Sequence, residues 1–238
     1  MLRFHRLAIA SLAVLIFRFH DFLRLAWPCV AVSLVAGSVS APYAWAGGIV
    51  ELLARGLFVA TWVRLVHDGL APAGTVRLRL GRRDAAAAVV WMVAETFVTL
   101  PGRFIGTAAA VITQTPVADT LMVTVAVSHL LLGGAYLVVA DVVLAGGPWA
   151  RSRAAEGTWC LPDMVVRGGF AVGVTMVLAW LPGTLLGATL RQLPAVELLE
   201  GLTLEHAAQV VGGIIGLAVI AGTMAMLWNA LAKETQGA

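Results

Sequence analysis

The chain has 238 residues, of which 60% are hydrophobic and only 12% are charged, and its formal net charge is +3. A soluble domain of this length cannot cover so large an apolar fraction with so few charges, so the composition excludes an ordinary soluble protein. A bilayer solvates apolar surface but requires backbone polar groups to be bonded internally, which makes long apolar runs helical. We therefore expect an all-α fold, a polytopic transmembrane helical bundle that forms a single domain over residues 1–238.

The first predicted element is an amphipathic helix over residues 3–24 that lies in the membrane interface. The apolar run within it, residues 7–17, is too short to cross the hydrocarbon core. Its charged residues fall along one line of a helical wheel, and they are Arg3, Arg6, Arg18, Asp21 and Arg24. Such a pattern is typical of an interfacial helix. The alternative is that the segment extends the first span.

Six apolar segments follow, and each is long enough to cross a bilayer, for which about 20 residues suffice. They cover residues 25–46, 48–66, 85–112, 119–145, 166–190 and 207–232. Proline removes a backbone donor and clashes with the preceding helical turn. We therefore expect Pro101 in the third segment and Pro182 in the fifth to kink or end a helix.

Basic residues gather in alternate connectors, which predicts the orientation of the chain. Twelve lie before the first span, between the second and third, between the fourth and fifth, and after the sixth. The connectors on the opposite side contain only Arg103 and Arg191. Cytoplasmic loops of membrane proteins carry an excess of Arg and Lys. The sequence thus predicts a multi-pass protein of a bacterial inner membrane with cytoplasmic N- and C-termini.

Charged and polar residues within the predicted spans form a candidate intramembrane network, comprising Glu51, Arg55, Glu95 and His129. Arg55 and Glu95 each lie eleven residues, about 16 Å, from the predicted cytoplasmic ends of neighbouring antiparallel helices. Their matched depth predicts an ion pair, and Glu51 lies one turn from Arg55 and can share its guanidinium. Two interpretations stay open, a structural pair that fixes helix register and an ion or proton path.

Small residues spaced four apart in the last two spans predict close helix packing. They are Gly169, Gly173, Gly183, Gly187, Gly212 and Gly216. Packing of these helices against each other within one bundle explains the pattern. The alternative is contact with a second copy of the chain or with another membrane protein.

No motif specifies a reaction, a cofactor or a metal, so we expect a protein that is not an enzyme. The sequence contains neither a nucleotide-binding loop nor a zinc-protease or serine-hydrolase motif. Cys29 and Cys160 are far apart and lack the spacing of metal ligands. Nucleic acid is not an expected partner, because the positive charge follows the membrane topology. Membrane lipids are the expected partner.

One pattern resembles a known group of proteins. Trp62, Val63 and Arg64 are followed by His67, Asp68 and Gly69, and then by Leu80, Gly81, Arg82, Arg83 and Asp84. This arrangement is similar to uncharacterised six-helix bacterial inner-membrane proteins, in which Trp-x-Arg closes the second span and Leu-Gly-Arg-Arg opens the third. More remotely, the chain resembles the membrane-domain family associated with glycerophosphodiester phosphodiesterases. The resemblance implies a fold and a location, and it implies no activity.

These observations favour a non-catalytic integral membrane protein that acts as an accessory, assembly or scaffolding component. The alternative is a small transporter or channel that uses Arg55, Glu95 and His129 within the membrane.

Overall fold

The computed structural model describes residues 4–39, 41–69, 81–145, 169–179, 189–190, 197–199 and 202–236. The predicted all-α helical bundle is confirmed. The elements are α1 (Phe4–Phe17), α2 (Phe19–Gly37), η1 (Ala41–Tyr43), α3 (Ala44–Asp68), α4 (Arg82–Thr113), α5 (Val117–Leu132), η2 (Gly133–Tyr136), α6 (Leu137–Ala145), β1 (Glu197–Leu199), β2 (Leu202–Thr203) and α9 (Leu204–Gln236). A further helix covers Gly169–Ala179. The two short strands pair in antiparallel fashion.

Four helical segments of the described part are long and apolar enough to cross a membrane. They are Phe19–Gly37, Arg82–Thr113, Val117–Leu144 and Leu204–Ala230. These correspond to predicted spans one, three, four and six. The second predicted span, residues 48–66, lies within the 25-residue helix α3. Only part of the fifth, residues 166–190, falls in the described residues, where the chain is helical from Gly169 to Ala179.

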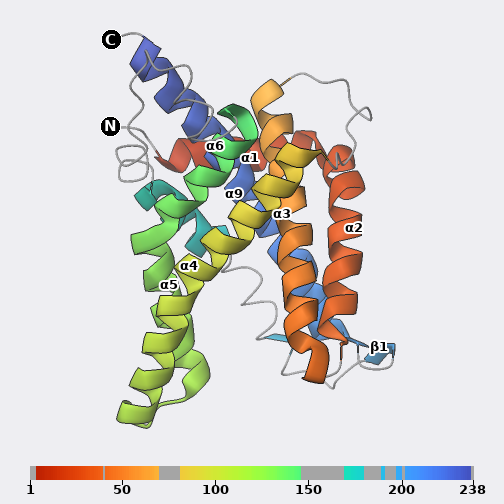
Figure 1. Cartoon of the computed structure of the whole chain (residues 1–238), viewed down its shortest axis with the longest axis vertical. Coiled ribbons are helices and arrows are strands. Elements are labelled where there is room, and N and C mark those ends of the chain that lie inside the picture. Colours follow the sequence, from red (N-terminus) through yellow and green to blue (C-terminus); the bar gives the residue numbers. More distant parts are fainter. Residues whose placement is uncertain are drawn as a thin grey trace.

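The helices are arranged around α3 and α9. In Figure 1, α2 and α3 run side by side, and α9 passes behind them. Helix α4 crosses the bundle obliquely and forms a hairpin with α5 that extends away from α2 and α3 (Figure 1). Phe22, Phe58 and Trp62 pack their rings edge to face or stacked, with centroids 5.9 to 6.1 Å apart, at the α2–α3 contact. Aromatic packing of this kind supplies much of the buried area that fixes these two helices together.

The predicted helix over residues 3–24 is wrong in its extent, because the chain turns sharply at Arg18. Helix α1 ends at Phe17, and α2 begins at Phe19 and runs in a different direction (Figure 1). The charged residues at the start of α2 therefore do not continue the polar line of α1. Helix α1 lies across one end of the bundle, against α9, where the Ser11 hydroxyl donates to the carbonyl of Val219 at 2.7 Å.

The predicted boundary between the first two spans is also wrong. Helix α2 ends at Gly37 rather than at residue 46, and α3 begins at Ala44. The hydroxyl of Ser38 donates to the carbonyl of Val35 at 2.8 Å, and the 3₁₀ turn Ala41–Tyr43 follows. Pro42 lies in that turn, where it lacks the backbone donor that a continuing helix needs. No charged residue marks this turn, so hydropathy does not reveal it.

The fourth predicted span, residues 119–145, is helical throughout but is not one continuous α-helix. Helix α5 ends at Leu132, the 3₁₀ segment η2 covers Gly133–Tyr136, and α6 continues from Leu137. By contrast, α4 continues through Pro101 to Thr113, so the expected end of a helix at this proline is not observed. Pro182, the other proline expected to kink or end a helix, lies outside the described residues.

Candidate functional site

Two oppositely charged residues of α3, Glu51 and Arg55, pair with each other. Arg55 forms an ion pair with Glu51 on the same helical face, as the sequence predicts. Both side chains are about a quarter exposed, at 28% and 25%. The Nε atom of Arg55 is buried and has no hydrogen-bond partner within the described residues. The positive charge of Arg55 is therefore balanced by the carboxylate of Glu51 on the same helix.

The predicted ion pair between Arg55 and Glu95 is wrong, because each of these side chains bonds to another residue. Helices α3 and α4 approach closely at Gly56, where an added Cβ would lie 2.6 Å from the Cα of Ala88. Ala88 precedes Glu95 by seven residues, about 10 Å along α4. Beyond this contact α4 diverges from α3 (Figure 1). The prediction counted residues from the helix ends and did not include this oblique crossing. It therefore paired Arg55 with Glu95, although the two side chains contact different neighbours.

Glu95 belongs instead to a second polar group, which it forms with Tyr136 and His129. The hydroxyl of Tyr136 donates to Oε2 of Glu95 at 2.6 Å. The same hydroxyl lies 3.4 Å from Nε2 of His129, and Nδ1 of His129 lies 2.8 Å from the carbonyl oxygen of Val125. A carboxylate, a phenol and an imidazole thus lie in sequence within segments that the hydropathy assigns to the membrane. Of the predicted network, only Glu95 and His129 meet here.

Tyr136 is the member of this group that the sequence analysis missed. It is fully buried, and its ring lies 4.9 Å from that of Trp91 and stacks on the imidazole of His129 with centroids 6.2 Å apart. It lies at the end of η2, so the break after α5 sets its position. The signal in the sequence is the pair Gly133 and Gly134 inside an otherwise apolar run, followed at once by an aromatic residue with a polar tip.

Glycines on the helix Gly169–Ala179 allow η2 to pack closely. A Cβ added at Gly173 would lie 2.4 Å from the carbonyl oxygen of His129, and one at Gly133 would lie 2.7 Å from the Cα of Gly173. A Cβ at Gly169 would lie 3.1 Å from the Cα of Gly134. Gly169 and Gly173 thus lie at close helix contacts, but they contact η2 and α5 rather than the last predicted span, against which the sequence analysis expected them to pack.

The remaining predicted packing glycines have separate places. An added Cβ at Gly216 of α9 would lie 2.8 Å from the carbonyl oxygen of Ala179, so this residue does join the last two predicted spans. Gly212 also lies on α9 and is half-buried. Gly183 and Gly187 lie outside the described residues.

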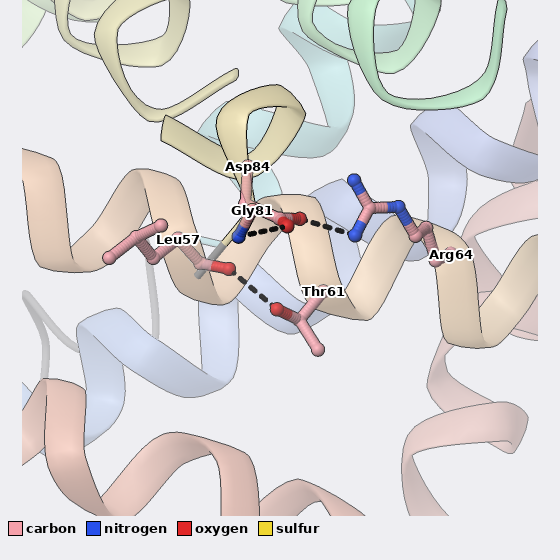
Figure 2. Close-up of polar contacts among 5 residues, drawn as sticks. All are labelled: Leu57, Thr61, Arg64, Gly81 and Asp84. Atoms are coloured by element: carbon pink, nitrogen blue, oxygen red, sulfur yellow. Dashed lines mark hydrogen bonds and ion pairs between the residues drawn. The ribbon is translucent and has the colours of Figure 1, made fainter. Parts of the chain in front are cut away.

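A further ion pair joins α3 to α4 at the end where α3 stops and α4 starts. Figure 2 shows Arg64 donating to the carboxylate of Asp84, which also accepts the backbone N–H of Gly81 at 3.0 Å. Asp84 therefore caps the first turn of α4 and neutralises Arg64 at the same time. On the α3 side, the Thr61 hydroxyl donates to the carbonyl of Leu57 at 2.9 Å (Figure 2).

His67 extends this polar end toward α9. Its Nδ1 lies 2.6 Å from Oδ1 of Asn229, and its ring meets that of Trp228 edge to face with centroids 5.5 Å apart. Four residues of the pattern that carries the resemblance thus lie where α3 contacts its neighbours. They are Trp62, Arg64, His67 and Asp84. In the structure these residues make packing and capping contacts.

The described residues contain no group of three or more His, Cys, Asp or Glu side chains that could hold a metal ion. No protein-family model, curated protein or solved structure matches the chain.

Proposed function

We propose that this chain is a non-catalytic integral protein of a bacterial inner membrane that acts as an accessory, assembly or scaffolding component. The observation that carries the proposal is the pairing of charges on α3, where Arg55 pairs with Glu51 and Arg64 pairs with Asp84. The first pair lies within α3, and the second joins α3 to α4 and so fixes how these two helices meet. They do not leave a free charge for a passing ion.

Membrane lipids are the proposed partner of the outer surface of α4 and α5. Large apolar side chains there are mostly exposed, including Phe97, Leu100, Phe104, Ile105, Ile112, Val123 and Leu131. Such a surface aggregates in water, whereas lipid tails solvate it. Both helices of the α4–α5 hairpin carry such residues, which favours contact with lipid along the hairpin.

The proposed orientation puts both termini in the cytoplasm. It rests on the excess of basic residues in alternate connectors. It is supported by α1, the end of α3, the start of α4 and the C-terminal part of α9, which all lie at one end of the molecule (Figure 1). Helix α1 exposes Ile9, Leu12 and Ile16, so an interfacial position would bury these side chains among lipid headgroups and upper tails.

A small transporter is the second candidate, and the contact of Glu95, Tyr136 and His129 favours it. Ionisable residues within membrane spans often mark ion or proton pathways. These three lie beside the break between α5 and α6, and broken helices form binding sites in many transporters. Arg55 does not belong to this candidate path, since it is paired with Glu51.

Photo-crosslinking in native membranes, combined with a flux assay, separates the two candidates. Benzoylphenylalanine is placed at Phe104 and Leu131, each 77% exposed, and at the buried Val139 as a control. An accessory role predicts one dominant protein adduct from an exposed site, none from position 139, and no proton flux in proteoliposomes. Lipid adducts alone, together with a proton flux that Glu95→Gln abolishes, would replace the accessory role by transport.

A further inference from the structure

The hydrogen-bond geometry around His129 restricts where its protons are. Nδ1 of His129 lies 2.8 Å from the carbonyl oxygen of Val125, and a carbonyl oxygen only accepts. Nδ1 must therefore carry a hydrogen. In a neutral imidazole this leaves Nε2 as an acceptor, and Nε2 carries a hydrogen only when the ring is cationic.

Tyr136 has one hydroxyl hydrogen to share between two neighbours. Its oxygen lies 2.6 Å from Oε2 of Glu95 and 3.4 Å from Nε2 of His129. If Glu95 is ionised and His129 is neutral, the hydroxyl donates to the carboxylate and two lone pairs face each other on the histidine side. In that state the contact between the Tyr136 oxygen and Nε2 of His129 contains no hydrogen.

One added proton fills both contacts, and it can do so in two ways. With the proton on Nε2, the imidazolium donates to the phenol oxygen and the phenol donates to the Glu95 carboxylate. With the proton on Oε2, the carboxylic acid donates to the phenol oxygen and the phenol donates to Nε2 of His129. The two forms interconvert when Tyr136 accepts one hydrogen as it releases the other, so atoms and charge balance.

We propose that Glu95, Tyr136 and His129 together form an intramembrane site that binds a single proton and relays it across the Tyr136 hydroxyl. This site goes beyond the accessory role proposed above and does not depend on it, because a bound proton need not be transported. Glu95 and His129 are partly exposed on segments that the hydropathy assigns to the membrane. An acid and a base that share one proton there are electrically neutral as a group, which is the form that a low-dielectric surrounding favours.

Charged residues also lie on the described elements that are packed around the site. On α3, Glu51 and Arg55 neutralise each other and Arg64 is paired with Asp84 of α4. On α6, Asp141 is fully buried and makes interactions of its own. The helix Gly169–Ala179, whose glycines contact η2, contains no titratable side chain.

The surroundings also hold the two ends of the relay at fixed separation. Gly133 and Gly173 let η2 approach the neighbouring helix, and the Trp91 ring covers that of Tyr136. The Ser128 hydroxyl donates to the carbonyl of Val98 and joins α5 to α4 within three residues of both His129 and Glu95. This hydrogen bond between α4 and α5 keeps the Glu95 carboxylate and the His129 imidazole on either side of the Tyr136 hydroxyl.

Equilibrium proton uptake tests the proposal without any flux measurement. The full chain in lipid nanodiscs is titrated while infrared spectroscopy follows carboxylic-acid groups and ¹⁵N NMR follows histidine. We expect the carboxyl signal of Glu95 and the ring signals of His129 to change at one common midpoint, with one proton bound per chain. Glu95→Gln and His129→Asn should each abolish the shared step.

Tyr136→Phe is the decisive variant, because it keeps the ring that packs on Trp91 and removes only the hydroxyl. It should split the common step into two with different midpoints, at unchanged helix content. His20→Asn, a histidine at the start of α2 outside the site, should leave the step as in the wild type. Two independent steps in the wild type, or a common step that survives Tyr136→Phe, would overturn the relay. A proton step without flux supports the site and leaves the accessory role intact.

Discussion

Arg64 of α3 donates to Asp84 of α4, and the same carboxylate accepts the backbone N–H of Gly81 at the start of α4. The side chain of Asp84 is only 4% exposed and that of Arg64 is 21% exposed. A buried carboxylate is costly unless it is paired and hydrogen-bonded. Here the arginine and the helix N-terminus both stabilise its negative charge, so one residue fixes where α4 begins and how it meets α3.

Removal of one partner of this pair should destabilise the fold strongly. Arg64→Ala leaves the buried Asp84 without its counter-charge, and breaking a buried pair in this way costs about 3–5 kcal/mol. We expect the lower end, because Arg64 is partly exposed. Denaturant unfolding in detergent micelles measures the loss, and Arg64→Ala with Asp84→Ala should lose less than the sum of the single variants. Arg83→Ala, an exposed neighbour, should stay within about 0.5 kcal/mol, and additive losses would contradict a coupled pair.

The contact of Gly173 with α5 makes a second prediction about stability. A Cβ at this position would lie 2.4 Å from the carbonyl oxygen of His129 and 2.8 Å from the Cα of Leu130, so the backbone must move. Overpacking of this kind costs about 1–3 kcal/mol. Gly173→Ala should therefore lower the midpoint of thermal unfolding. Gly48→Ala is the matched control, since its Cβ meets nothing within 4 Å and the change should be neutral or slightly stabilising.

The general architecture could be predicted from the sequence, because apolar length alone requires helices in a bilayer. Helix α4 and the C-terminal helix α9 begin and end within a few residues of the predicted spans. The errors occurred where the turn is made without charge, at Ser38 to Tyr43 and at Gly133 to Tyr136. The turn at Arg18 was missed for the opposite reason, since the charges around it fit one helical wheel.

The candidate site was only half predictable. Glu51 and Arg55 are one turn apart, so local spacing predicted their contact. The partner of Glu95 depended on the angle between α3 and α4 and on the break in the fourth span, neither of which hydropathy encodes. Small residues such as Gly56 set how closely two helices approach. The sequence spacing along α3 does not predict that Ala88 of α4 lies against Gly56.

The docking of α1 on α9 predicts a size limit at Gly222. A Cβ there would lie 2.1 Å from the hydroxyl oxygen of Ser11, whose hydrogen bond to Val219 anchors α1. Gly222→Ala should therefore loosen α1, and maleimide should label Leu15→Cys, at a buried position, faster by about tenfold for each 1.4 kcal/mol of lost docking. The labelling background lacks the two native cysteines.

Two further variants make this test specific to the contact. Ser11→Gly removes the hydroxyl that the new Cβ would meet, and with it the hydrogen bond to Val219. Ser11→Gly combined with Gly222→Ala should therefore label no faster than Ser11→Gly alone. Gly213→Ala on the same helix meets nothing within 4 Å and should label at the rate of the background protein. Fast labelling of Leu15→Cys in that background would show that α1 is not docked on α9 in the membrane, and it would contradict the prediction.

The orientation of the bundle gives the last prediction. Ser38, just after the end of α2, and Gln114, just after the end of α4, lie at one end of the bundle, whereas Asp68, the last residue of α3, lies at the other end. All three side chains are exposed, and none of the predicted cytoplasmic arginines needs to be changed to probe them. In intact spheroplasts of cells that express single-cysteine variants, a membrane-impermeant maleimide should label positions 38 and 114. Position 68 should react only after the membrane is permeabilised. The opposite pattern would reverse the proposed topology, because the basic connectors would then face outward, against the distribution of arginine that the cytoplasmic side of membranes favours.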